Sequence, residues 1–155
     1  MTLSISGISR KYLERVEETT SVREAARKMR EKNVSSLLVV DTSGIPVGLV
    51  TERDIVRKFF INDVSAYTLT SKDIMSSPLI AISVSSSIST AADMMLKNNV
   101  RHLLIVDDGD KPIGIITPLD FVRHQKHIAE EDREAIERVL ERYMSSPDSD
   151  LLTGV

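Results

Sequence analysis

The sequence contains no cysteine among its 155 residues. A chain without thiols forms no disulfide bond, binds no metal through thiolates and has no cysteine nucleophile. It also lacks an unbroken apolar run of about 18 residues, the length that a membrane-spanning helix needs. The first residues, Met1 to Arg10, lack the apolar core of a secretory signal. We therefore expect a cytoplasmic protein without membrane contact.

A surplus of positive charge is missing too, because 20 Lys and Arg residues stand against 23 Asp and Glu residues. General nucleic-acid binding usually needs a basic face that neutralises phosphates, so we expect none here. The composition is 41% hydrophobic and 28% charged, which is typical of a folded chain rather than a disordered one. A chain of this length fits one compact domain.

The clearest pattern is an internal repeat. Residues 33–41 read Asn-Val-Ser-Ser-Leu-Leu-Val-Val-Asp, and residues 99–107 read Asn-Val-Arg-His-Leu-Leu-Ile-Val-Asp, an offset of 66 positions. The same offset pairs further identical residues: Ser21 with Ser87, Ala25 with Ala91, Ala26 with Ala92, Met29 with Met95, Pro46 with Pro112, Gly48 with Gly114, Thr51 with Thr117, Asp54 with Asp120 and Arg57 with Arg123. No gap is needed from Ser21 to Arg57, so the chain contains two copies of one unit.

Each copy reads as strand, helix, strand, strand, helix, which predicts an α/β fold. Apolar residues recur at helical spacing after Ser21 and after Ser87, and both serines are suited to cap a helix. Leu37 to Val40 and Leu103 to Val106 are continuous apolar runs, typical of strands covered on both faces. Turn residues then lead into a second strand, so each copy contains a hairpin. Ile80 to Ile82 supplies the leading strand of copy two, and Val16 marks a shorter one in copy one.

A third element follows the hairpin in both copies: Gly48 to Asp54 and its equivalent Gly114 to Asp120, of the form Gly-h-h-Thr-x-x-Asp, where h is apolar. The threonine is placed to cap a helix, and the aspartate stands three residues later. Such an element gathers backbone N–H groups, a hydroxyl and a carboxylate, which can hold a phosphorylated sugar. The alternative is a capping box without a ligand, and on these residues alone that is the commoner case.

With the repeat, the strand pattern and this element together, the sequence resembles a tandem pair of CBS domains, the family named for cystathionine β-synthase. The resemblance covers about Ile8 to Gln125. It implies two β-α-β-β-α repeats related by a pseudo-two-fold axis, with two clefts that take residues from both copies. Such clefts commonly bind AMP, ADP or ATP, and sometimes S-adenosylmethionine or another adenosyl ligand.

The resemblance also implies roles for single residues. Asp54 and Asp120 take the position of the ribose-binding aspartate, and Thr51 and Thr117 that of its hydroxyl partner. Base and strand contacts map onto Val34, Ser35, Val100, Arg101, Ile80 and Ala81, and onto Val16 to Thr19.

Three basic positions have two interpretations each. Arg101 and His102 stand where copy one has Ser35 and Ser36, and they resemble a phosphate-facing pair, although a solvated strand entrance fits as well. Arg53 lies in the first turn of a helix, where a cation opposes the helix dipole, so a phosphate partner would explain it; otherwise it is a surface residue.

Catalytic and metal sites find little support. His124 and His127 are three residues apart near a helix end, where a favourable interaction with the helix C-terminus is commoner than a metal site. No nucleophile-and-base pair, P-loop or ligand cluster accompanies them. We expect no enzyme, no catalytic residue, no metal and no required cofactor.

The segment from Glu130 to Met144 predicts an amphipathic helix. Its apolar stripe contains Ile136, Val139, Leu140, Tyr143 and Met144. The stripe needs a surface to cover: its own repeats, a second subunit or an effector protein, of which the first two are commoner.

These patterns divide the chain into repeat one (8–60), a linker (61–73), repeat two (74–126), a C-terminal helix (127–145) and a flexible tail (146–155). The expected function is a regulatory module that senses an adenine nucleotide and signals to a partner by conformational change. The alternatives are a ligand-free scaffold or dimerisation module and a sensor of S-adenosylmethionine or another adenosyl ligand.

We predict a homodimer, because the resemblance implies pairing through outer helices and Phe59, Phe60 and Ile61 stand at the end of one such helix. Sedimentation velocity at micromolar concentration should give the mass of two chains. A monomer would contradict this, and would favour the alternative in which Phe59 is a core residue and Phe60 packs on the C-terminal helix.

Overall fold

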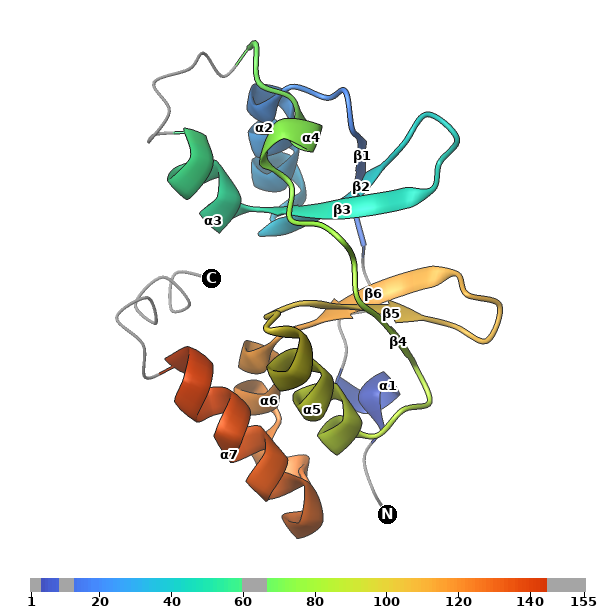
Figure 1. The fold of residues 1–155 in the computed structure, drawn as a ribbon, viewed down its shortest axis with the longest axis vertical. Coiled ribbons are helices and arrows are strands. Elements are labelled where there is room, and N and C mark those ends of the chain that lie inside the picture. The colour runs from blue at the N-terminus through green and yellow to red at the C-terminus, as the bar shows by residue number, and fades with distance from the viewer. Residues whose placement is uncertain (1–3, 9–12, 60–66, 145–155) are drawn as a thin grey trace. The chain divides into compact units, whose positions relative to one another are not determined.

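The computed structural model describes residues 4–8, 13–59 and 67–144, which form two compact units. The first unit comprises the described residues from 13 to 79. The second comprises the described residues from 80 onward together with helix α1 (Ile5–Ile8). Figure 1 shows the elements of both, and each unit is considered by itself.

The first unit is built on a three-stranded sheet in the order β1 (Arg15–Glu17), β2 (Ser36–Val40), β3 (Pro46–Thr51). Strand β1 runs parallel to β2, and β3 runs antiparallel to it. The helices are α2 (Val22–Lys32), α3 (Glu52–Asp54), which continues as a π-helical turn η1 (Ile55–Phe59), and α4 (Ser71–Ile74).

The second unit repeats this sheet as β4 (Ala81–Ser83), β5 (Leu103–Val106), β6 (Pro112–Ile116), with the same strand directions. Its helices after α1 are α5 (Ile88–Asn98), α6 (Pro118–Arg123), a 3-10 turn η2 (Gln125–His127) and α7 (Glu130–Met144). The predicted α/β class and β-α-β-β-α order are therefore confirmed in both units.

Local signals start and end the long helix of each unit. Ser21 Oγ accepts a hydrogen bond from the N–H of Glu24, and Ser87 Oγ accepts one from Thr90, which satisfies an N–H group that the helix itself leaves unpaired. Asn33 ends α2 with φ of 53°, and Asn99 ends α5 with φ of 51°. This left-handed conformation is one that asparagine tolerates better than most residues.

The short helices α1 and α4 are equivalent in sequence, because Ile8 and Ile74 are 66 positions apart. Each packs on the copy to which it does not belong. Ile5 and Ile8 of α1 are buried in the core of the second unit, and Ile74 of α4 is buried in the first. The leading helices of the two copies are thus exchanged between the two units, which no sequence pattern predicts.

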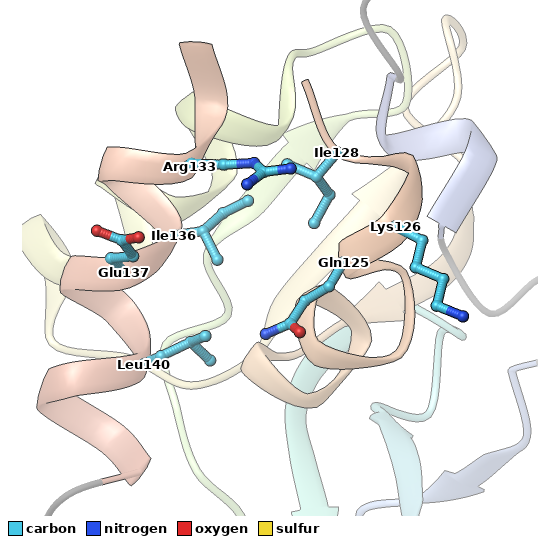
Figure 2. Close-up of a pocket in the computed structure, with 7 residues that line it drawn as sticks. All are labelled: Gln125, Lys126, Ile128, Arg133, Ile136, Glu137 and Leu140. Carbon is cyan, nitrogen blue, oxygen red and sulfur yellow. The ribbon is translucent and has the colours of Figure 1, made fainter. Parts of the chain in front are cut away.

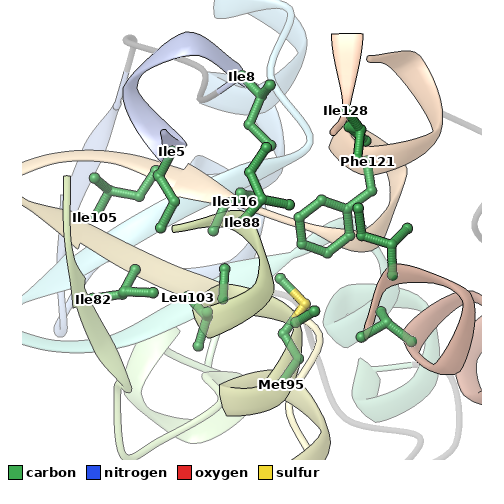
Figure 3. Packing of buried hydrophobic residues seen from close by; sticks show 14 of the residues in the cluster. Ile5, Ile8, Ile82, Ile88, Met95, Leu103, Ile105, Ile116, Phe121 and Ile128 are labelled. Atoms are coloured by element: carbon green, nitrogen blue, oxygen red, sulfur yellow. The ribbon is translucent and has the colours of Figure 1, made fainter. Parts of the chain in front are cut away.

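Helix α7 completes the core of the second unit. Its buried residues Ile136, Val139 and Tyr143 join a cluster that surrounds Phe121, whose other members include Ile88, Met95 and Ile116; Figure 3 shows this packing. Of the three surfaces that the apolar stripe of this helix could cover, the structure shows it packed on its own repeats.

Some sequence predictions fall outside the residues that the structure describes. They concern the Phe59 side chain, Phe60, Ile61 and the rest of the predicted linker up to residue 66, the Met144 side chain, and the predicted tail. The homodimer, which rests partly on Phe60 and Ile61, therefore stays a prediction.

None of the helices in the described ranges is both long and apolar enough to cross a membrane.

The hairpin turns of the two units share one hydrogen-bonding arrangement but differ in the residue at the left-handed position. In each, an aspartate that follows the central strand accepts two backbone N–H bonds: Asp41 Oδ1 from Ser43 and Ile45, and Asp107 Oδ1 from Gly109 and Lys111. The left-handed turn position is Gly44 (φ 80°) in the first unit and Asp110 (φ 60°) in the second. Glycine meets no steric penalty in this region.

We predict that Gly44→Ala lowers the free energy of unfolding by about 1 kcal/mol, because an added Cβ finds open space but a strained φ. Gly109→Ala is the matched control, since Gly109 belongs to the equivalent turn without a left-handed φ. Urea denaturation of both variants measures the difference. Equal stability of the two variants would show that the turn does not hold this conformation in solution.

Candidate functional site

The Thr-x-x-Asp element of the first unit forms a complete capping box at the start of α3. The N–H of Thr51 donates to Asp54 Oδ2 at 3.0 Å, the Thr51 hydroxyl donates to the same oxygen at 3.0 Å, and the N–H of Asp54 donates to Thr51 Oγ1 at 3.1 Å. Asp54 is only 8% exposed. Thr51 is the last residue of strand β3. Asp54 lies in the first turn of α3, where its carboxylate meets the threonine.

The second unit repeats this arrangement at the start of α6. The N–H of Thr117 donates to Asp120 Oδ2 at 2.8 Å, and the hydroxyl donates to the same oxygen at 3.2 Å. Asp120 is 1% exposed, so this carboxylate is buried even more completely. Pro118 occupies the first helical position, where its missing N–H costs no hydrogen bond within the helix.

A third capping box offers a comparison within the same chain. The N–H and the hydroxyl of Thr70 donate to Asp73 Oδ2 at 2.8 and 2.9 Å. The backbone hydrogen bond from Thr70, followed by the hydroxyl bond, lowers the pKa of Asp73, which is exposed. Because capping geometry alone recurs at this exposed position, it does not define a ligand site. The buried carboxylate at the end of a glycine-containing strand distinguishes the other two elements.

The two buried carboxylates differ in their other neighbours. Asp54 Oδ1 lies 3.4 Å from Nζ of Lys58 and accepts a hydrogen bond of 3.2 Å from Ser76 Oγ. At the position of Lys58 the second unit has His124, whose Nδ1 lies 2.9 Å from the backbone oxygen of Asp120. The histidine thus interacts with the end of its own helix, as the sequence suggests. The lysine that neighbours the first carboxylate therefore corresponds in sequence to a histidine that contacts the backbone of its own helix.

The residues just before strands β2 and β5 form the strand entrances. In the first unit, the N–H of Glu52 donates to the carbonyl of Ser35 at 3.0 Å, which ties the entrance of β2 to the start of α3. In the second unit, the positions equivalent to Ser35 and Glu52 are Arg101 and Pro118. Because proline has no N–H, the equivalent bond cannot form.

The other predicted contact residues are placed by the sheets and helix ends. The N–H groups of Val34 and Val100 donate to carbonyls in the last turn of α2 and of α5. Ile80 accepts a hydrogen bond from Leu104, and Ala81 begins β4. Arg53 and His102 are half-buried. The first unit thus brings its cap element and strand entrance together. The assignment of these residues to a ligand stays a prediction.

Arg101 adopts an arrangement that neither sequence interpretation includes. Its guanidinium carbon lies 5.2 Å from the centre of the Tyr143 ring in α7, a cation–π contact. Its Nη1 atom is buried without a hydrogen-bond partner. The two residues are far apart in the sequence, so no local pattern indicates the contact. Two partners of Asp54 were also missed: Lys58 could have been inferred from its i, i+4 spacing, but Ser76 could not.

A groove in the second unit lies between the turn η2 and helix α7, as Figure 2 shows. Its volume is about 360 Å³, and its lining combines apolar and charged side chains: Gln125, Lys126, Ile128, Arg133, Ile136, Glu137 and Leu140. None of the predicted site residues lines it. Within the described ranges, no group of three or more His, Asp or Glu side chains is arranged to hold a metal ion.

Comparison with known proteins relates both repeats to one family. The profile of the CBS domain matches residues 5–60 and 72–127, which leaves α7 outside the match. A protein of Methanopyrus kandleri whose function is uncharacterised is 30% identical over 139 residues, or 90% of this chain and 71% of that protein.

Similar proteins have been solved with adenosyl ligands bound. The CBS domain pair of protein MJ0100, in complex with 5′-methylthioadenosine and S-adenosyl-L-methionine, is 26% identical with a TM-score of 0.69, covering 82% of this chain and 98% of that one. The protein CBSX2, in complex with AMP, is 26% identical with a TM-score of 0.61, covering 80% of this chain and 96% of that one.

Proposed function

Because this chain belongs to the CBS domain family, we propose that it is a non-catalytic regulatory module that binds an adenine nucleotide at its cap elements. The observation that carries the proposal is the buried Thr–Asp pair at the end of a glycine-containing strand, present in both units. The adenosyl ligands of the two similar structures support this class of ligand. The module would change conformation on binding this ligand, and a partner would recognise the changed conformation.

The chemistry of the cap suits a ribose. An ionised carboxylate only accepts hydrogen bonds, and its two oxygens can receive both hydroxyls of a ribose diol. The capping threonine holds the carboxylate through Oδ2 in both units. A ligand would therefore meet a carboxylate whose orientation is already fixed, which reduces the entropy lost on binding.

We propose that the element with Thr117 and Asp120 is the better site for a phosphorylated nucleoside. The first element has Glu52 next to its capping threonine, whereas the second has the neutral Pro118. A carboxylate within about 5 Å of a phosphate costs on the order of 1 kcal/mol, close to tenfold in affinity. Arg53 opposes this penalty in the first element.

A second candidate ligand follows from the same residues. Glu52 would disfavour a phosphate but would attract a cationic sulfonium, which S-adenosylmethionine carries. The first element is therefore better suited to an adenosyl ligand without phosphate than the second.

Thermal unfolding tests whether any such ligand binds. We expect AMP, ADP or ATP to raise the unfolding temperature, because a ligand at a hundred times its dissociation constant stabilises the folded state by about 2.7 kcal/mol. S-adenosylmethionine is measured in parallel. An unchanged unfolding temperature with all four compounds would favour the alternative of a ligand-free scaffold.

Titration calorimetry with AMP ranks the two sites. Asp120→Ala should weaken AMP binding by about 1.5–3 kcal/mol, more than tenfold, because the ribose loses its charged acceptor. Asp54→Ala should have a smaller effect. Asp73→Ala is the matched control, since it removes the exposed capping box and should leave affinity unchanged.

Loss of affinity in Asp54→Ala but not in Asp120→Ala would reverse the ranking of the sites. Normal affinity in both would show that the two carboxylates serve only as helix caps.

A further inference from the structure

Arg101 belongs to two neighbourhoods of the second unit. Its backbone lies two residues before β5, at the position equivalent to Ser35, whose carbonyl accepts the N–H at the start of α3 in the first unit. Its guanidinium, however, is turned to the ring of Tyr143 in the last turn of α7. One side chain therefore connects the proposed phosphate environment to the C-terminal helix.

The last turn of α7 also donates hydrogen bonds to the segment that precedes β5. The hydroxyl of Tyr143 donates to the carbonyl of Met95 at 3.1 Å, and Nη1 of Arg142 donates to the carbonyl of Leu96 at 2.8 Å. Both carbonyls belong to the last turn of α5, shortly before Arg101. Since the CBS profile ends at residue 127, these contacts come from an element outside the matched repeat.

The first unit has a backbone hydrogen bond whose donor is absent from the second. In the first unit, the N–H of Glu52 secures the carbonyl of Ser35. Pro118 cannot supply that bond to Arg101, so the backbone link between strand entrance and helix start is missing in the second unit. Side chains of α7 instead contact the last turn of α5 and the Arg101 side chain. These contacts can change without breaking a strand or helix.

The present partner of Arg101 leaves it incompletely satisfied. Tyr143 is 4% exposed, and Nη1 of Arg101 is buried without a hydrogen-bond acceptor. The face of an aromatic ring attracts a cation but does not replace hydrogen bonds to a guanidinium in a buried place. A phosphate offers charge-assisted, bidentate hydrogen bonds, which are among the strongest that arginine makes.

We propose that Arg101 couples phosphate binding at the Thr117–Asp120 element to the last turn of α7. Without phosphate, the guanidinium lies on Tyr143 and stabilises that turn. When a bound nucleotide presents its phosphate, Arg101 leaves the ring and the turn becomes looser. Coupling between sites is reciprocal, so weakening the Arg101–Tyr143 contact raises nucleotide affinity. This coupling rests on the function proposed above.

The first test uses the unaltered protein with AMP and with adenosine, which differ only in the phosphate. Hydrogen–deuterium exchange reports the backbone amides of residues 139–143. AMP should increase their exchange, whereas saturating adenosine should leave it unchanged. Equal exchange with both ligands would overturn the coupling.

The second test uses two substitutions that both remove the Tyr143 hydroxyl. Tyr143→Phe keeps the ring, and should keep both the AMP affinity and the AMP-dependent exchange of the parent. Tyr143→Leu removes the ring, and should bind AMP about threefold or more tightly, because the competing cation–π contact is gone. Its α7 amides should already exchange quickly without AMP. If Tyr143→Leu does not fold, Arg101→Gln should abolish the AMP-dependent exchange while Tyr143 remains.

The outcomes separate the two proposals. AMP binding that depends on Asp120, without any AMP-specific change in α7 and with equal affinities in Tyr143→Phe and Tyr143→Leu, would refute the coupling and leave the proposed function intact. Failure of AMP, ADP and ATP to bind would refute the proposed function, and the coupling with it.

Discussion

The hydrogen bonds between a capping threonine and the aspartate three residues later fix the junction of strand and helix in both units. Thr51 and Thr117 each donate a backbone N–H and a hydroxyl to one carboxylate oxygen. A buried carboxylate without such donors would be strongly destabilising, so the fold tolerates these aspartates only where the strand delivers the threonine. The same bonds fix the orientation of the carboxylate.

Most of the fold could be predicted because its signals are local and occur twice. The offset of 66 residues supplies two serine caps, two apolar strand runs and two Thr-x-x-Asp caps, and both units form the elements that these signals specify. The helices α1 and α4 could not be predicted, because four residues are too few for helical periodicity. Which repeat each one covers is a tertiary choice, decided by where Ile8 and Ile74 can be buried.

Only the part of the candidate site that the capping pattern and the family resemblance identify could be predicted. Both identify Asp54 and Asp120, but neither indicates that Ser76 would approach Asp54 from 22 positions away. Likewise, no residue near Arg101 in the sequence points to Tyr143. The amphipathic pattern of α7 indicates that the Tyr143 ring is buried but not which residues it contacts. Contacts of this kind depend on packing between distant segments.

The shared backbone also explains why the two sites can differ chemically. The positions that the junction needs, Gly, Thr and Asp, are identical in both copies, whereas adjacent positions carry Glu52 or Pro118, Lys58 or His124, and Ser35 or Arg101. These side chains lie beside the capping hydrogen bonds rather than within them, so exchanging them costs the junction little. Charge near each carboxylate can therefore vary independently of the fold. A duplicated unit can in this way combine one backbone geometry with two different electrostatic surroundings. In the second unit, the contact of Arg101 with Tyr143 links one of these variable positions to a helix outside the matched repeat.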